Sequence, residues 1–165
     1  MSDSPYRIAV VCLGNICRSP TAEVVLRDRV EGAGLDDRVE VVSAGTSRYE
    51  IGNPMDSRAA RELRGRGYDV PDRTAQQFGA DAFADVDLVL AMDASNHDDL
   101  LAVAPDGAAR GKVRMFRDFD PEAADGDREV PDPWYGGQAG FADVLSTVER
   151  TSDAIVAQLP DLIGR

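Results

Sequence analysis

The chain has 165 residues, of which 43% are hydrophobic and 6% aromatic, so it holds enough apolar material for one folded domain and is not generally disordered. Thirty acidic residues against 18 basic ones give a net charge of −12. Such a charge repels phosphate backbones, which argues against nucleic acid or an anionic membrane as the partner. We therefore expect a single domain over residues 1–165, with any phosphate chemistry confined to a pocket.

Rare residue types narrow the possible chemistry. Lys112 is the only Lys and His97 the only His, which argues against a His-rich metal site and a Ser-His-Asp triad. Cys12 and Cys17 are too few for a disulfide scaffold or a four-ligand zinc site. The first residues lack the features of a signal peptide, and no apolar run approaches the roughly 20 residues of a membrane span. We expect a cytoplasmic protein that uses no metal and no cofactor.

Strand and helix patterns alternate along the chain. Nearly continuous apolar runs predict strands over residues 6–13, 39–42, 86–92 and 113–116. Helical spacing and stop signals predict helices from Ser19 to Gly32–Gly34 and over residues 56–67, 74–83, 94–103 and 141–159. Ser19 is the expected N-cap of the first helix, and Pro160 is expected to end the last. This order predicts an α/β fold, a three-layer sandwich with a central four-stranded parallel sheet flanked by helices.

The segment from Cys12 to Ser19 joins the first strand to the first helix. A loop of this length can curl so that its N–H groups and the helix N-terminus surround an anion, and Gly14 and Asn15 tolerate the left-handed backbone that such a curl needs. Arg18 offers a planar fork for two phosphate oxygens, while the same field favours the thiolate of Cys12, to which Ser19 can donate. The alternative is a buried structural Cys beside an anion site.

An acid is needed if the leaving group is a phenolate, and with a single His in the chain it must be a carboxylic acid. Asp132 lies between Pro131 and Pro133, whose restricted backbones can aim its side chain. Trp134 and Tyr135 follow directly and offer stacking surface for an aryl ring. The alternative is an ordinary Asp-Pro turn in an acidic loop, residues 118–132.

The stretch from Val11 to Pro20 resembles the signature of the low-molecular-weight protein tyrosine phosphatases. The similarity continues, in the family order, at residues 43–46, 52–59, 92–93 with Asn96, and 132–135. The resemblance implies hydrolysis of phosphotyrosine through a phosphocysteine on Cys12, with Arg18 binding phosphate and Asp132 acting as general acid and then base. It implies tyrosine-phosphorylated proteins as partners; we expect a monomer or weak dimer.

The resemblance also implies supporting roles for other residues. The phosphate-binding loop would comprise Leu13, Gly14, Asn15, Ile16, Cys17, Arg18 and Ser19; Asn15, Ser19 and Ser43 would form a supporting network; and Tyr49, Trp134 and Tyr135 would line the substrate pocket. Cys17 could merely pack or could trap oxidised Cys12 as a reversible disulfide. The chain departs from the family in two places. Trp134 replaces the usual first aromatic residue, and the segment Arg73 to Gln76 replaces a His-x-Ala-Arg segment, so the network's usual His is missing.

Three other functions fit parts of this pattern. An arsenate reductase has a similar loop, but its thiol relay needs further cysteines and none follows Cys17. A non-catalytic anion-binding module would not need Cys12, Arg18 and Asp132 together. A thiol oxidoreductase would be expected to use Cys-x-x-Cys, which is not the spacing of Cys12 and Cys17.

Overall fold

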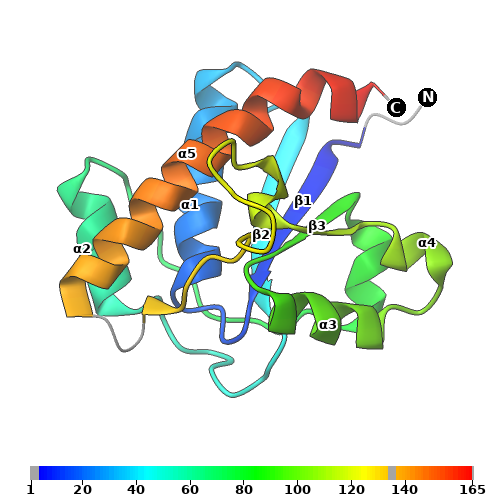
Figure 1. Ribbon diagram of the computed structural model, residues 1–165, viewed down its shortest axis with the longest axis horizontal. Coiled ribbons are helices and arrows are strands. Elements are labelled where there is room, and N and C mark those ends of the chain that lie inside the picture. The colour runs from blue at the N-terminus through cyan, green and yellow to red at the C-terminus, as the bar shows by residue number, and fades with distance from the viewer. Residues whose placement is uncertain (1–3, 134–136, 165) are drawn as a thin grey trace.

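The computed structural model describes residues 4–133 and 137–164 and shows a parallel sheet with helices on both faces (Figure 1). The strands are β1 (Tyr6–Cys12), β2 (Val39–Gly45), β3 (Leu88–Ala91) and β4 (Val113–Met115). They lie in the order β2-β1-β3-β4, and each neighbouring pair is parallel. The predicted α/β fold with a four-stranded parallel sheet is therefore confirmed.

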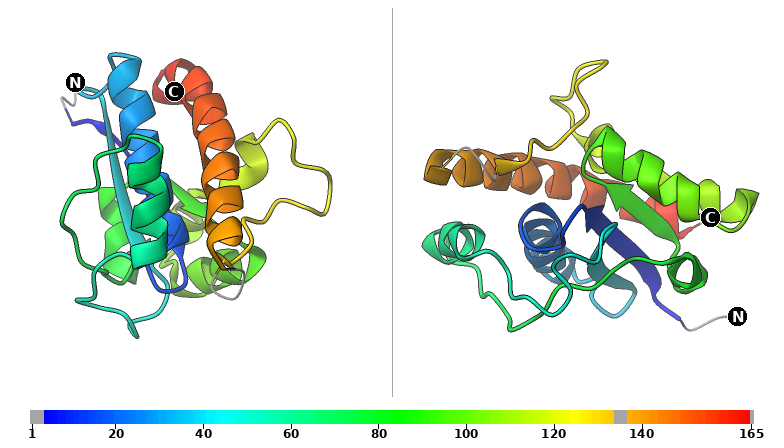
Figure 2. Two further views of the ribbon diagram at one scale, coloured as in Figure 1. Left: turned by 90° about the vertical axis from the view of Figure 1, so that its left-hand side faces the viewer. Right: turned by 90° about the horizontal axis from the view of Figure 1, so that it is seen from below.

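The helices are divided between the two faces of this sheet, as two further views show (Figure 2). They are α1 (Arg18–Gly32), α2 (Ser57–Gly65), α3 (Ala94–Val103), α4 (Gly107–Arg110) and α5 (Gly137–Ile163), with a 3-10 turn at Ala80–Asp85. Helices α1 and α5 pack on one face, and α3 packs beside β3 and β4. Among the described residues, no helix combines the length and the apolar character that crossing a membrane requires.

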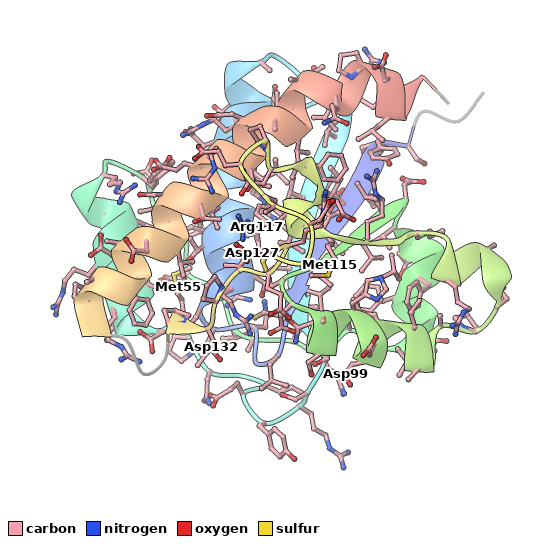
Figure 3. The ribbon with its side chains drawn as sticks, in the orientation of Figure 1. Met55, Asp99, Met115, Arg117, Asp127 and Asp132 are labelled. Carbon is pink, nitrogen blue, oxygen red and sulfur yellow. The ribbon has the colours of Figure 1, made fainter. Side chains whose placement is uncertain are left out.

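The connection from β4 to α5 is long and mostly irregular, as the acidic stretch predicted. It begins with a 3-10 turn over Phe116–Phe119 and then carries Asp127 and Asp132 toward the start of α5 (Figure 3). Val130 anchors it, because this fully buried residue donates its N–H to the Met92 carbonyl oxygen over 2.7 Å. Asp132 is thereby held beside the carboxyl end of β3.

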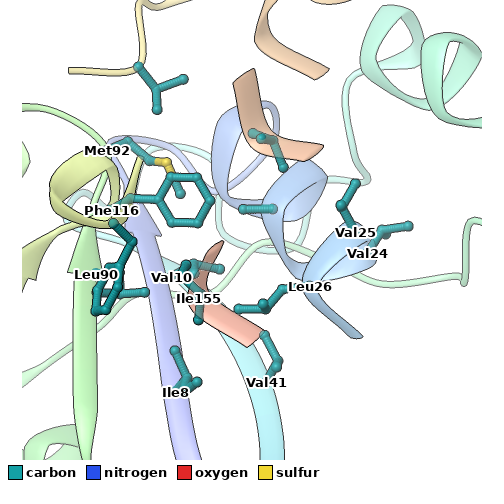
Figure 4. Close-up of a cluster of buried hydrophobic side chains, with 14 of the residues drawn as sticks. Ile8, Val10, Val24, Val25, Leu26, Val41, Leu90, Met92, Phe116 and Ile155 are labelled. Carbon is teal, nitrogen blue, oxygen red and sulfur yellow. The ribbon is translucent and has the colours of Figure 1, made fainter. Parts of the chain in front are cut away.

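The two faces of β1 explain why its sequence is almost continuously apolar. Ile8 and Val10 belong to the core under α1 and α5 (Figure 4), whereas Ala9 and Val11 belong to the core on the opposite face. All four side chains have no exposed surface. Burying a Val or Ile side chain fully contributes about 1.5–3 kcal/mol to stability, so β1 holds the start of the loop that follows Cys12 in place.

The predicted helix over residues 74–83 is wrong. Residues 74–79 run extended alongside the end of β2, where Gly45 donates to the Gln76 carbonyl oxygen and accepts from the Phe78 N–H, both over 2.8 Å. Only the 3-10 turn at Ala80–Asp85 is helical. Pairing with a strand some 30 residues earlier satisfies these backbone groups, so the segment has no need of helical hydrogen bonds.

The predicted end of the last helix at Pro160 is also wrong, because α5 continues to Ile163 with Pro160 inside it. A Pro removes one helical hydrogen bond, which costs little this close to the helix end. The fully buried Ile155 and Leu159 hold this part of α5 against the core. By contrast, α3 matches its predicted bounds, and Asp93 caps it by accepting the Asn96 N–H over 2.7 Å.

Candidate active site

Most of the predicted site residues that the structure describes line one pocket of about 260 Å³ beyond the carboxyl end of β1, whereas Asn15, Ser19 and Ser43 lie behind its wall. Its wall is formed by Cys12, Leu13, Gly14, Ile16, Cys17, Arg18, Ser47, Tyr49, Glu50 and Asp132. Ser47 and Glu50 come from the loop after β2 and were not predicted from the sequence. Trp134 and Tyr135, the other two predicted pocket residues, lie outside the described residues.

The loop between β1 and α1 directs its carbonyl oxygens away from the pocket. Those of Leu13, Ile16 and Cys17 accept the N–H groups of Ser47, Asp56 and Thr21 over 2.8–3.1 Å. In contrast, the N–H groups of Gly14, Ile16, Cys17, Arg18 and Ser19 donate to no residue within 4–133 or 137–164. Unpaired N–H groups are costly unless a ligand or water accepts them. Five such donors at a helix N-terminus form a site for a tetrahedral anion.

Asn15 gives the loop its curvature. It is fully buried and is the only non-glycine residue of the described chain with a positive φ, 59°. Gly14, which could also tolerate a left-handed backbone, does not adopt one. Asn is tolerated in this conformation because its short side chain can hydrogen-bond locally. Here the Asn15 side-chain oxygen accepts the Gln76 N–H over 3.0 Å, and its Nδ2 donates to Ser19 Oγ over 2.8 Å and to Ser43 Oγ over 3.0 Å.

The donors and acceptors of these hydrogen bonds can be assigned from Asn15 through Ser19 to the Cys12 sulfur. Ser43 donates its only hydroxyl proton to the carboxylate of Glu23, so Asn15 must be the donor to Ser43. Asn15 also donates to Ser19, which leaves the Ser19 proton free for the Cys12 Sγ at 3.0 Å or the Ala44 carbonyl oxygen at 3.3 Å. A hydroxyl donated to the sulfur favours its thiolate form.

Ser19 therefore does not cap the first helix as predicted. Helix α1 begins at Arg18, and Cys17, which precedes it, makes no side-chain capping bond. Ser19 lies two residues beyond the N-cap position, and its hydroxyl contacts Cys12 and Asn15 instead. Glu23, which is 8% exposed, was not predicted either, because its burial depends on the packing of β2 beside α1.

Arg18 is held rigidly at the base of the pocket. The residue is 3% exposed, and its Nη1 donates to Asp93 Oδ2 over 2.7 Å and to the Val130 carbonyl oxygen over 3.0 Å. Burial alone would lower the pKa of Arg18, but Cys12 and Asp93 together raise it above its ordinary value. Nη2 lies 3.8 Å from Asp132 Oδ2, so the cation and the predicted acid are neighbours.

The second cysteine lies in the same pocket wall but in a different environment. Cys17 is 7% exposed, and burial, followed by the charges of Asp56 and Cys12, raises the pKa of its thiol. It is therefore a neutral thiol near pH 7, unsuited to act as the nucleophile. Within residues 4–133 and 137–164, no three His, Cys, Asp or Glu side chains are arranged to hold a metal ion.

Comparison with known proteins identifies the family. Residues 7–161 match the family described as low molecular weight phosphotyrosine protein phosphatase. The chain belongs to this family. A Streptomyces coelicolor protein named low molecular weight protein-tyrosine-phosphatase is 44% identical over 158 residues, which are 96% of either chain. Membership makes the protein a protein-tyrosine phosphatase and thus a hydrolase.

Solved structures agree with this assignment. A protein tyrosine phosphatase from Entamoeba histolytica is 34% identical, with a TM-score of 0.88 over 94% of this chain and 97% of its own. The Wzb protein of Vibrio vulnificus, solved in complex with benzylphosphonate, is 29% identical, with a TM-score of 0.80 over 94% of this chain and 99% of its own.

Proposed function

We propose that the protein hydrolyses phosphotyrosine in proteins, and aryl phosphate monoesters in general, through a phosphocysteine intermediate on Cys12. The observation that carries this proposal is the Cys12 Sγ at 3.0 Å from the Ser19 hydroxyl, within the same loop as five N–H groups that have no described partner. Hydrogen-bond donors around a sulfur favour its thiolate form, and the same donors bind phosphate oxygens.

The first step transfers the phosphoryl group to sulfur. The loop N–H groups and Arg18 bind the phosphate oxygens, and the Cys12 thiolate attacks phosphorus as the bond from phosphorus to the phenolic oxygen breaks. Asp132, whose side chain is about half exposed at the pocket mouth, gives its proton to the departing oxygen. The products of this step are the phenol of tyrosine and a phosphate ester on sulfur.

The second step returns the free enzyme. Asp132, now ionised, takes a proton from a water molecule, and the oxygen of that water attacks phosphorus. The bond between sulfur and phosphorus breaks, the Cys12 thiolate is restored with the Ser19 hydroxyl donating to it, and inorganic phosphate leaves. Because the loop and Arg18 supply the positive charge that the phosphate needs, turnover should persist with a metal chelator present.

The pocket wall favours an aryl group over a short aliphatic one. Tyr49 and Leu13 are 87% and 46% exposed and line the pocket mouth, where an aromatic ring can lie against them. The relative solved with benzylphosphonate, an aryl compound with a phosphonate group, supports the same preference. A phosphoserine side chain is too short to bring its phosphorus to Cys12 past such a wall.

The role of Asp132 can be tested through the leaving group. We expect Asp132→Asn to lower kcat/KM, which reports the first step, for phosphotyrosine by about 10²–10⁴, and by less for p-nitrophenyl phosphate, whose leaving group needs less protonation. Asp125→Asn is the matched control, because Asp125 is a fully exposed acid on the same segment and does not line the pocket. Equal losses for both substrates would show that Asp132 is not the general acid. Full turnover by Cys12→Ser would refute the proposed function as a whole.

A further inference from the structure

Arg73 contacts the phosphate-binding loop from outside it. It lies in the segment that runs extended beside the end of β2, and its guanidinium reaches Asn15 at two points. Nη1 donates to the Asn15 carbonyl oxygen over 2.9 Å, and Nη2 donates to the Asn15 side-chain oxygen over 2.5 Å. Nη2 also lies 3.4 Å from Ser43 Oγ. The position at which the family often has a His is thus occupied by a residue that makes these contacts itself.

These two hydrogen bonds hold both the backbone and the side chain of Asn15. Donation to its carbonyl oxygen holds the left-handed backbone, and donation to its side-chain oxygen, together with that of the Gln76 N–H, fixes which way the amide is turned. The amide orientation determines that Nδ2 faces Ser19 and Ser43. If the amide turned over, its oxygen would face Ser19, whose proton would then be drawn toward Asn15 and away from Cys12.

The charge of Arg73 adds to the effect of its hydrogen bonds. Burial lowers the pKa of Arg73, opposed by the charges of Glu23 on α1 and Cys12 on β1, while Arg27 on α1 acts in the same direction as burial. An Arg remains protonated throughout the range in which proteins work. Arg73 is therefore a cation at every pH of interest, and its hydrogen bonds to Asn15 stay charge-assisted.

We propose that Arg73 is a positioning residue for the reaction on Cys12: it holds Asn15 in place so that the Ser19 hydroxyl stays directed at the Cys12 sulfur. This inference rests on the proposed function, because it concerns the alignment of the proposed nucleophile. Arg73 does not line the pocket and so acts through Asn15.

The test compares Arg73→Met and Arg73→Lys with a matched control, Arg66→Met. Arg66 also donates to a carbonyl oxygen, that of Ala142, and to a side-chain carboxylate, but it lies outside the pocket wall and has no contact with the loop. For each variant, kcat and KM for p-nitrophenyl phosphate, the rate of Cys12 alkylation by iodoacetamide between pH 5 and pH 8, and thermal unfolding are measured.

We expect Arg73→Met to lower kcat/KM by roughly ten- to a hundredfold, since charge-assisted hydrogen bonds to the loop are lost. Cys12 alkylation in this variant should require a higher pH than in the native protein. Arg73→Lys should recover part of the loss, because it keeps the charge and one donor. Arg66→Met should unfold at a lower temperature than the native protein but keep native kcat/KM and native alkylation.

Native kcat/KM and an unshifted alkylation profile in folded Arg73→Met would overturn the inference. If Arg73→Met does not fold, folded Arg73→Lys decides: kcat/KM below native supports the inference, and native kcat/KM overturns it. Failure of the proposed function would look different, because the native protein itself would then show no turnover that depends on Cys12.

Discussion

Replacing Asp120 with Asn should strongly destabilise the protein. The Asp120 side chain has no exposed surface, and its two oxygens accept from Arg150 Nε and Nη2 over 2.8 and 2.9 Å, from Arg117 Nε over 2.8 Å and from the Glu122 N–H over 2.9 Å. An Asn side chain has one oxygen, so its NH₂ group must face at least one of these donors. The substitution therefore breaks a buried ion pair and leaves the guanidinium of Arg117, only 9% exposed, with the exposed carboxylate of Asp127 at 3.4 Å as its remaining ion-pair partner.

The size of this effect follows from burial. Breaking a buried ion pair by removing one partner costs about 3–5 kcal/mol. For a chain of this size, 1 kcal/mol shifts Tm by roughly 2–4 °C, so Asp120→Asn should lower Tm by about 6–20 °C. Asp125→Asn is again the control, and as an exposed substitution it should change the free energy of unfolding by no more than about 0.5 kcal/mol. For both variants, circular dichroism during heating measures Tm, and during urea titration it measures the free energy of unfolding.

The effect should also depend on pH. Hydrogen bonds from Arg150, and then from the Glu122 N–H and Arg117, hold the pKa of Asp120 well below its usual range despite its burial. In the unfolded chain the pKa of Asp is about 3.9, so the unfolded state binds the proton first as the pH falls. The stability that Asp120 adds is complete above that value and is lost below it. This reasoning would be refuted if the free energies of unfolding of the native protein and Asp120→Asn differed by less than about 1 kcal/mol at pH 7. It would also be refuted if that difference did not narrow between pH 5 and pH 3.

Two further predictions concern the loop. A Cβ at Gly45 would lie 2.6 Å from the Leu13 carbonyl oxygen, so Gly45→Ala should cost about 1–3 kcal/mol of stability and lower phosphatase activity. A Cβ at Gly32 would meet nothing within 4 Å, so Gly32→Ala should do neither, and equal Tm values for the two variants would contradict this. After brief peroxide treatment, added thiol should restore activity to the native protein but much less to Cys17→Ser. The reason is that the Cys17 thiol displaces water from the sulfenic acid of Cys12 to form a disulfide. Equal recovery of the two proteins would show that Cys17 only packs.

The elements that were predictable are those whose signals are local. Strand β1 could be predicted because both of its faces are buried, which its continuous apolar run reflects. Helix α3 could be predicted to the residue because Asp93 is a suitable N-cap. The loop from Cys12 to Ser19 was found because strand, loop and helix follow directly in the sequence.

The features that were missed depend on partners far along the chain. Residues 74–79 hydrogen-bond to Gly45, and no local pattern encodes that pairing. Glu23 has the sequence position of an ordinary helix surface residue, and only the packing of Ser43 against it makes it part of the network. At Arg73 the sequence indicated only that the network's usual His is missing. The hydrogen bond from Arg73 to Asn15 could not be predicted, because it depends on the path of the chain between α2 and β3.

Rapid-quench analysis of the native protein and of Asp132→Asn with p-nitrophenyl phosphate tests most directly whether Cys12 carries the phosphoryl group. We predict a burst of p-nitrophenol close to one equivalent per protein when the second step is slowed by Asp132→Asn, together with a phosphate on the Cys12 sulfur that mass spectrometry can locate. Cys12→Ser should show neither. A phosphate found on another residue, or steady turnover with no phosphorylated protein at any quench time, would contradict the mechanism.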